Sequence, residues 1–345
     1  MSITTTRRSK PHQHHRKKTY KKPLNCHPSL YLKNKHKKIL NHSCLTSEAL
    51  ELLKKTYNDK NPANPILSNN PKEIWDHLHE KIPQCNQETC WIQNIPDITL
   101  QNKLKKELFT PFQPSSWKKN KNEWLSNYDI DAVLKQYENA YYDEKTGIKH
   151  FISLGPTPID FDTKNIYGRC INDDICRLSL SNEYNKGVRK IGIIYNLDHH
   201  RGIGTHWVSM FINMTESTPE ESTTEKPFIF YFNSTSQRMP KQIKDLVDRL
   251  QKQWVAFKGY KFEIYKNTRI EHQNTDNECG MYSLFFIITC LTRKIDYSER
   301  LVEDGRIAGG QKILTISNLL DLFTRKHKIE DSYVAKFREI FFTKS

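Results

Sequence analysis

Acidic residues are missing from the first part of the chain. Between Met1 and Ser47 there is no Asp or Glu, although the 345-residue chain has 39 acidic and 54 basic residues in all. This segment therefore supplies most of the formal net charge of +15. A block of positive charge indicates contact with a polyanion such as nucleic acid, a localisation signal, or a solvated tail without a ligand. The candidates for nucleic-acid contact are Arg7, Arg8, Arg16, Lys17, Lys18, Lys21 and Lys22.

The chain also lacks a long apolar run. The longest candidate, Met281 to Leu291, is about half the length of a membrane-spanning helix, so we expect a buried helix and no membrane partner. The N-terminus has no apolar segment of the secretory type, which predicts a protein that is not secreted. Inside a cell, the eight cysteines are expected to be reduced thiols, of which one can be catalytic.

Metal-ligand spacing is absent too. Cys26-His27 and His42-x-Cys44 match no familiar zinc finger, and neither Cys85 with Cys90 nor Cys170 with Cys176 makes a convincing metal pair. We expect no metal and no cofactor.

Periodicity and composition divide the chain into four parts. They are a basic disordered tail (1–40), a helical N-terminal arm (41–83), an α/β body (84–294) and a C-terminal helical extension (295–345). In the arm, the patterns predict helices over 45–57 and 72–81. In the body, they predict helices over 129–142, from Pro240 onward and over 281–291, and strands over 190–196, 207–212, 227–232 and 260–265. The fold class is α+β, with a central sheet flanked by helices.

Four polar residues lie where these elements begin or end. His206 opens one strand, Asn233 closes the next, Cys279 begins the buried helix, and Gln273 lies on the loop before it. A thiol at a helix N-terminus is stabilised as thiolate, a nearby imidazole can take its proton, and an amide on the other ring nitrogen fixes the tautomer. The backbone N–H of Cys279 and the Gln273 amide could form an oxyanion hole. Each residue alone also has a structural explanation, as a small core thiol, a packed His or a turn Asn, and His200 stays open as another base.

The motifs around these residues resemble the SUMO-protease/adenovirus-protease clan of cysteine proteases. The run 272–280 is similar to its Gln-to-Asp-Cys-Gly signature, with Glu278 in place of Asp. The runs 204–208 and 230–234 resemble its His-Trp strand and its aromatic-aromatic-Asp-Ser strand end, with Asn233 in place of Asp. The run 123–130 resembles its early Trp-Leu-Asn-Asp motif. A His-Asn-Cys set and a basic helical arm are similar to African swine fever virus-type proteases of large nucleocytoplasmic DNA viruses.

The resemblance implies both the chemistry and the biology. It implies a SUMO-protease/adenain-like fold with Cys279 as nucleophile, His206 as base, Asn233 as its partner and Gln273 as oxyanion donor. It implies that Trp207 and Trp124 bind substrate, and that Trp207 covers a channel for glycine-sized residues. The expected function is endopeptidase cleavage after Gly-Gly-type sites in virion structural precursors, in the virion and the viral factory of the host cytoplasm.

Other readings stay open. A host-directed deSUMOylase or deubiquitinase would use the same residues, as would a Ser/Thr acetyltransferase, although no phosphate-cradling loop for coenzyme A is evident. A nucleic-acid-binding virion protein would depend on the tail and not on Cys279. Activation by DNA is a further hypothesis. The run Ile307-Ala-Gly-Gly-Gln311 also resembles a cleavage site, which predicts either self-cleavage after Gly310 or a flexible turn.

Overall fold

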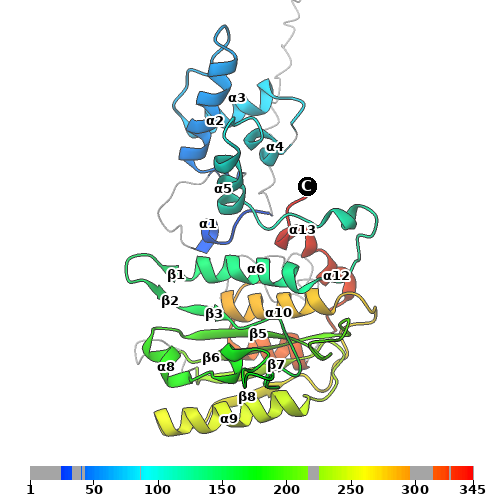
Figure 1. The fold of residues 1–345 in the computed structure, drawn as a ribbon. Coiled ribbons are helices and arrows are strands. Elements are labelled where there is room, and N and C mark those ends of the chain that lie inside the picture. The colour runs from blue at the N-terminus through cyan, green and yellow to red at the C-terminus, as the bar shows by residue number, and fades with distance from the viewer. Residues whose placement is uncertain are drawn as a thin grey trace, which may run out of the picture.

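The computed structural model describes residues 25–32, 40, 43–85, 87–216, 225–295, 314–325 and 328–344. A helical arm lies at one end of the molecule, and a sheet covered by helices on both faces forms the body (Figure 1). The basic tail and the run around Gly310 are outside the described residues, so the predictions made for them stay predictions. None of the described helices is both long and apolar enough to cross a bilayer.

The arm is a cluster of helices with its own core. Thr46 and Asn70 cap the first two long helices by accepting a backbone N–H at each N-terminus. Their apolar faces meet around fully buried Leu50, Ile74 and Leu78. The predicted helices over 45–57 and 72–81 are confirmed, with small shifts at their ends. The helices of the arm are α1 (Ser29–Leu32), α2 (Ser47–Lys60), α3 (Pro71–Lys81), α4 (Glu88–Ile92) and α5 (Ile98–Leu108).

The structure corrects the prediction that the chain is disordered as far as residue 40. Cys26 is buried and pairs with Phe109 in an antiparallel bridge, and Leu30 joins the same core. These apolar side chains place residues 25–32 in the arm, because their burial offsets the entropy cost of ordering the segment. The arm's hydrophobic cluster runs from Cys26 to Phe109. The predicted domain boundaries stay predictions.

The expectation of reduced thiols is wrong for six of the eight cysteines. The structure contains the disulfides Cys26–Cys44, Cys85–Cys90 and Cys170–Cys176, and leaves Cys279 and Cys290 as free buried thiols. An expected reducing compartment predicts the same state for every cysteine, whereas the fold brings the members of these three pairs within bonding distance.

The body is built on a mixed sheet with strand order β3-β5-β6-β7-β8, in which β4 also pairs with β5. β5, β6 and β7 are antiparallel neighbours, while β3, β4 and β8 run parallel to theirs. The central strands are almost wholly buried because helices cover both faces, which explains their near-continuous apolar sequence. The strands are β3 (Phe151–Ser153), β4 (Thr157–Pro158), β5 (Lys190–Asn196), β6 (Trp207–Asn213), β7 (Phe228–Phe232) and β8 (Glu263–Lys266), with a separate hairpin of β1 (Tyr142–Asp143) and β2 (Ile148–Lys149).

Three long helices cover the sheet, in agreement with the predicted α+β architecture (Figure 1). α10 (Cys279–Thr292) and α6 (Asn127–Ala140) lie on one face, and α9 (Lys241–Lys258) lies on the other. α6 begins with a capping box between Ser126 and Asp129. α10 is buried along almost its whole length. The shorter elements are η1 (Ser115–Lys118), α7 (Asp173–Cys176) and α8 (Leu180–Asn185).

The C-terminal part is helical, as predicted, and it is built into the body. Its elements are α11 (Ile316–Leu320), η2 (Asp321–Arg325), α12 (Asp331–Ala335) and α13 (Arg338–Phe341). Phe323 stacks edge-on against Phe286 of α10 at 5.0 Å between ring centroids, and Phe337 packs on Phe285 at 4.7 Å. The segment therefore shares one hydrophobic core with α10 and the sheet.

Candidate active site

Two strand ends bring His206 and Asn233 together. β6 and β7 are antiparallel, so the start of β6 and the end of β7 lie at the same edge of the sheet. His206 precedes β6 and Asn233 follows β7, and His206 Nε2 lies 2.9 Å from Asn233 Oδ1. The predicted pairing of these two residues is present in the structure.

The hydrogen bonds of Asn233 fix the tautomer of His206. Asn233 Oδ1 also accepts the backbone N–H of Thr235 at 3.0 Å and the Thr235 hydroxyl at 2.8 Å. A backbone N–H can only donate, so the atom that it meets must be the amide oxygen and not the amide nitrogen. His206 Nε2 therefore carries a proton, and in the neutral ring Nδ1 has the free lone pair. Nδ1 is the atom of His206 that can act as a base.

Asn233 is held rigidly in this position. Its side chain is fully buried, and the amide of Asn267 donates to its backbone oxygen at 3.0 Å and to the Ile270 oxygen at 2.8 Å. These contacts connect the end of β7 to the loop after β8. The imidazole is thus oriented by an amide whose oxygen would lose its hydrogen bonds to His206 and Thr235 if the amide turned.

Cys279 lies beside this pair at the N-terminus of α10. Its sulfur receives a hydrogen bond from the backbone N–H of Trp207, the residue next to His206. Burial raises the pKa of the Cys279 thiol above its ordinary value, while the N–H groups of Trp207, Gly280 and Cys279 itself oppose that shift. Burial likewise lowers the pKa of His206, against the effect of the hydrogen bond that His206 donates to Asn233. Both shifts favour a neutral thiol beside a neutral imidazole.

Gln273 lies on the loop between β8 and α10 and is 5% exposed. The Ser234 hydroxyl donates to its Oε1 at 2.7 Å, and its backbone N–H donates to the Ser234 oxygen at 3.1 Å. Its Nε2 donates to the Thr275 oxygen. Because the amide carries two N–H bonds, one remains for a developing oxyanion. Its role as oxyanion donor stays a prediction.

The two predicted substrate-binding tryptophans differ in exposure. Trp207 is 7% exposed, and its indole N–H donates to the Leu125 oxygen at 3.1 Å. Trp124, next to Leu125, is 44% exposed. Gly280 packs so tightly on Leu125 that a Cβ there would lie 3.0 Å from the Leu125 Cβ. Leu125 therefore packs beside Cys279 and Gly280, with buried Trp207 fastened to it and Trp124 open to solvent.

His200 is placed away from this arrangement. Its Nδ1 lies 2.6 Å from Asp160 Oδ2, and its backbone N–H donates to Asp160 Oδ1 at 2.9 Å. His200 and Asp160 thus fasten the loop that leads to His206. Of the two histidines, His206 and not His200 meets Asn233 and lies next to Trp207, so the geometry favours His206 as the candidate base.

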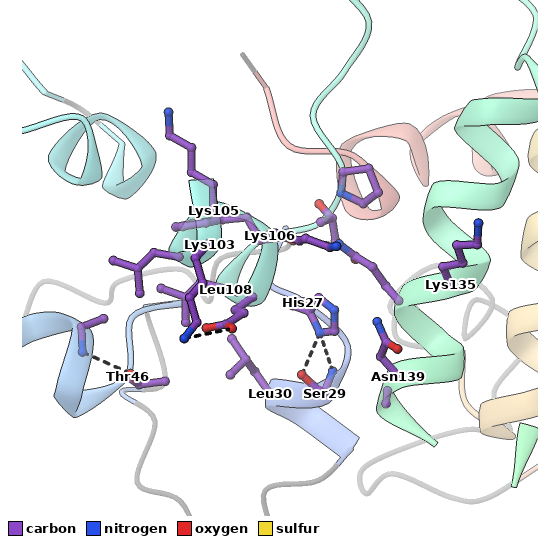
Figure 2. Close-up of a pocket in the computed structure, with 18 of the residues that line it drawn as sticks. His27, Ser29, Leu30, Thr46, Lys103, Lys105, Lys106, Leu108, Lys135 and Asn139 are labelled. Carbon is purple, nitrogen blue, oxygen red and sulfur yellow. Dashed lines mark hydrogen bonds and ion pairs between the residues drawn. The ribbon is translucent and has the colours of Figure 1, made fainter. Parts of the chain in front are cut away.

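A separate open pocket of about 2140 Å³ lies where the arm meets α6 (Figure 2). His27 and Lys106 line it from the arm and Lys135 and Asn139 from α6, whereas His206, Asn233, Gln273 and Cys279 do not. Several lysines there, including Lys103 and Lys135, are paired with acidic neighbours. Among the described residues, no cluster of three or more His, Cys, Asp or Glu is arranged to hold a metal.

Sequence reasoning missed the residues that support the site. Ser234 and Thr235 follow Asn233 directly, so a run of short hydroxyl residues after a strand was a usable signal. Asn267 and Asp331 carry no such signal, because their contacts with the site come from distant parts of the chain.

Comparison with known proteins agrees with this geometry. The model of the Ulp1 protease family, C-terminal catalytic domain, matches residues 185–304, which include His206, Asn233, Gln273 and Cys279. A protein of Acanthamoeba polyphaga mimivirus named as a thiol protease is 26% identical over 185 residues, 54% of this chain and 53% of its own length. The SUMO-1 cysteine protease of African swine fever virus is 27% identical over 230 residues, 63% of this chain and 77% of its own length.

The fold is shared with a solved viral structure. The crystal structure of a protease from African swine fever virus superposes with a TM-score of 0.55 over 94% of this chain and 97% of that one, at 18% identity. The chain spans about half the length of the mimivirus relative that it matches. The matched family model, the relatives and the fold point the same way: this chain is similar to cysteine proteases with a catalytic domain of the Ulp1 type.

Proposed function

We propose that the chain is an endopeptidase that cleaves protein substrates after Gly-Gly-type sites, with Cys279 as nucleophile and His206 as base. The observation that carries the proposal is the fixed tautomer of His206. Thr235 orients the Asn233 amide, and this leaves His206 Nδ1 as the free base. The next residue, Trp207, donates its backbone N–H to the Cys279 sulfur, so the base and the thiol lie close together.

The chemistry then follows from neutral reactants. His206 Nδ1 takes the thiol proton as the Cys279 sulfur attacks the substrate carbonyl, and the imidazolium is stabilised through Nε2 by Asn233 Oδ1. The carbonyl oxygen becomes an oxyanion that the Cys279 backbone N–H and the Gln273 amide can stabilise. His206 gives its proton to the leaving amine, and water releases the acyl group from sulfur. No separated charges have to be maintained in the resting site.

Burial of the nucleophile supports specificity for glycine. Cys279 is 1% exposed and lies behind Trp207, whose indole is fastened to Leu125. A substrate backbone that reaches this buried sulfur would pass close to Trp207 and Leu125, and a side chain on the residue before the scissile bond would then meet them. Glycine has no such side chain.

The substrates that we propose are precursors of virion structural proteins, processed in the virion or in the viral factory of the host cytoplasm. The relatives belong to large DNA viruses, which supports this setting. The second candidate is a host-directed deSUMOylase, favoured by the name of the African swine fever virus relative, SUMO-1 cysteine protease. Both need the same four site residues, so only substrate choice separates them.

The test compares wild type with Cys279→Ala on a fluorogenic hydrophobic-x-Gly-Gly peptide and on a SUMO-derived probe. Cys290→Ala is the matched control, because Cys290 is the other free thiol, is also buried and lies on the same helix. We expect peptide cleavage that is lost only in Cys279→Ala, and that falls steeply when the glycine before the scissile bond becomes alanine or valine. Preference for the SUMO probe would favour the second candidate. Thiol-dependent cleavage equally fast with valine at that position would refute the glycine channel.

Nucleic acid as a partner is a separate proposal, supported by charge alone. The basic residues from Arg7 to Lys22 are outside the described residues, and they join the structure at Asn25, near the pocket of Figure 2. Phosphate contacts release counterions, so binding should weaken steeply as salt rises. DNA activation would be refuted by peptide cleavage that is insensitive to DNA at low salt.

A further inference from the structure

The loop before the nucleophile is held by the C-terminal segment. Residues 272–278 carry Gln273 and lead into α10, and the backbone N–H groups of Asn274 and Thr275 point away from the sheet toward α12. Both donate to one carboxylate, that of Asp331. Asp331 Oδ2 accepts from Asn274 at 3.0 Å and from Thr275 at 2.8 Å.

The same carboxylate also reaches the nucleophile helix. Asp331 Oδ1 lies 2.9 Å from the hydroxyl of Tyr282, which is one turn after Cys279 in α10. That hydroxyl has a single proton and lies closer still to the Ile329 oxygen, at 2.6 Å. Asp331 thus connects two parts of the site, the loop that carries Gln273 and the helix that carries Cys279.

The contact with Thr275 extends to the Gln273 side chain. Gln273 Nε2 donates to the Thr275 oxygen, and Ser234 holds the other end of the amide through Oε1. The peptide unit of Thr275 therefore sets where the amide nitrogen lies, and Asp331 sets where Thr275 lies. Removing the Asp331 carboxylate would leave the N–H groups of Asn274 and Thr275 without their acceptor. The Thr275 oxygen that binds Gln273 Nε2 would then no longer be held in place.

The ends of the loop are fastened to the same segment. His272 is fully buried, its Nδ1 accepts the Ile329 N–H at 3.0 Å, and its Nε2 donates to the Phe323 oxygen at 3.0 Å. At the other end, buried Glu278 meets Arg338 of α13 at 3.4 Å. Between these two anchors, Asp331 holds the loop backbone at Asn274 and Thr275, while Lys328 donates to the Asn274 side chain.

We propose that Asp331 is a positioning residue for the oxyanion hole, acting on the Gln273 amide through the Asn274 and Thr275 backbone. It makes the C-terminal segment, which lies outside residues 185–304 matched by the protease family, part of the catalytic apparatus. The inference rests on the proposed function, since it concerns the placement of the oxyanion donor.

The test is a set of three variants of the full chain. Asp331→Ala removes the acceptor. Asp331→Asn keeps its shape, because its oxygen can accept from the loop while its NH₂ donates to the Tyr282 hydroxyl. Asp331→Glu keeps the charge but moves the carboxylate by about one bond length, so it loses the placement. Glu339→Gln is the control, since Glu339 is a surface carboxylate of α13 that pairs only with Lys344 among the described contacts.

The expected result separates placement from charge. Loss of an oxyanion donor costs about 10²–10³ in kcat, so Gln273→Ala should fall in that range. Asp331→Ala and Asp331→Glu should lose about 10- to 100-fold in kcat with KM little changed, and Asp331→Asn and Glu339→Gln should stay near wild type. Alkylation of Cys279 by iodoacetamide needs no oxyanion donor and should be unchanged. In the Gln273→Ala background, Asp331→Ala should add little, since the two act as a unit.

Several outcomes would overturn the inference. The first is full activity of Asp331→Glu together with impaired activity of Asp331→Asn. The second is a fall in the alkylation rate of Asp331→Ala as large as its fall in peptide cleavage. The third is full additivity of the losses in kcat when Asp331→Ala is combined with Gln273→Ala. Amide hydrogen exchange of residues 272–278 tests whether Asp331 holds the Asn274 and Thr275 backbone. It needs no activity measurement, and it can be made on Asp331→Glu even if Asp331→Ala fails to fold. Asp331→Glu should speed exchange at Asn274 and Thr275, and unchanged protection would refute the contact's role. If wild type cleaved no peptide, the proposed function would fail while hydrogen exchange still tested the loop.

Discussion

Replacing Asn233 by Asp should move the acid limb of the pH–activity profile to higher pH. Asn233 Oδ1 lies 2.9 Å from His206 Nε2, so the substitution places a negative charge in direct contact with the imidazole. An opposite charge within about 4–6 Å favours the charged form and shifts a pKa by about 1–3 units. The shift opposes burial, which lowers the pKa of His206 in the natural protein.

The sign follows from which form of His206 is active. In a neutral resting pair, only unprotonated His206 can take the proton from Cys279, so kcat/KM falls as His206 becomes protonated. A raised pKa means that protonation sets in at higher pH. The acid limb should therefore rise by about 1–3 pH units, equivalent to about 1.4–4 kcal/mol of added stabilisation of the imidazolium. Activity on the plateau should be largely kept, because a carboxylate can accept the same hydrogen bonds from Thr235.

The assay is kcat/KM for the hydrophobic-x-Gly-Gly peptide across the pH range. Asn182→Asp, at an exposed position of α8, controls for the change in net charge. An acid limb that stayed in place while the alkaline limb moved to higher pH in Asn233→Asp would show that the resting pair is already thiolate and imidazolium, and would refute the neutral-pair reasoning. An unmoved limb would show that His206 does not set it.

Three further outcomes are expected. Gly280→Ala should lower both kcat/KM and the free energy of unfolding, the latter by up to about 1–3 kcal/mol, because its Cβ would lie 3.0 Å from the Leu125 Cβ; denaturant unfolding that matched wild type would contradict this. His272→Gln should reduce the loss of stability in acid. Burial lowers the pKa of His272, so its contribution to stability is present above the unfolded pKa of 6.5 and is lost as pH falls through the folded pKa. An unfolding free energy with the same pH slope in both proteins would argue against this. Neutralising the seven tail residues from Arg7 to Lys22 should weaken DNA binding and reduce its salt dependence, as measured by titration at several salt concentrations, whereas an equal slope would exclude the tail.

Much of the body was predictable because its signals are local. The strand predicted over 190–196 coincides with β5, and the apolar run 281–291 lies within α10. Antiparallel pairing of β6 and β7 was enough to bring His206 and Asn233 to one edge. The site could be inferred from sequence because its parts lie where elements begin or end, and such boundaries have strong local signatures.

The contacts made by the C-terminal segment could not be predicted in this way. Asp331 follows Thr275 by 56 residues. An Asp at the start of a helix commonly stabilises that helix, and the surrounding sequence does not show whether it also binds a distant loop. The disulfides and the burial of Cys26 against Phe109 were missed for the same reason. Each depends on which surfaces pack together, and periodicity reports only that a face is apolar.

A neutral Asn beside His206 fits the buried position of the nucleophile. With Cys279 1% exposed and its pKa raised, a permanent thiolate would be a buried charge balanced only by backbone N–H groups and an imidazolium. An Asp at 233 would add a second buried anion, whereas Asn supplies the same hydrogen-bond acceptor without charge. A raised pKa keeps more of the Cys279 thiol protonated, which lowers its reactivity toward oxidants and stray electrophiles, since the thiolate is the reactive form. In the proposed mechanism, the sulfur becomes nucleophilic only when a substrate carbonyl is in place and the Gln273 amide can stabilise the oxyanion. The proposed support of that amide by Asp331 would then act on the rate.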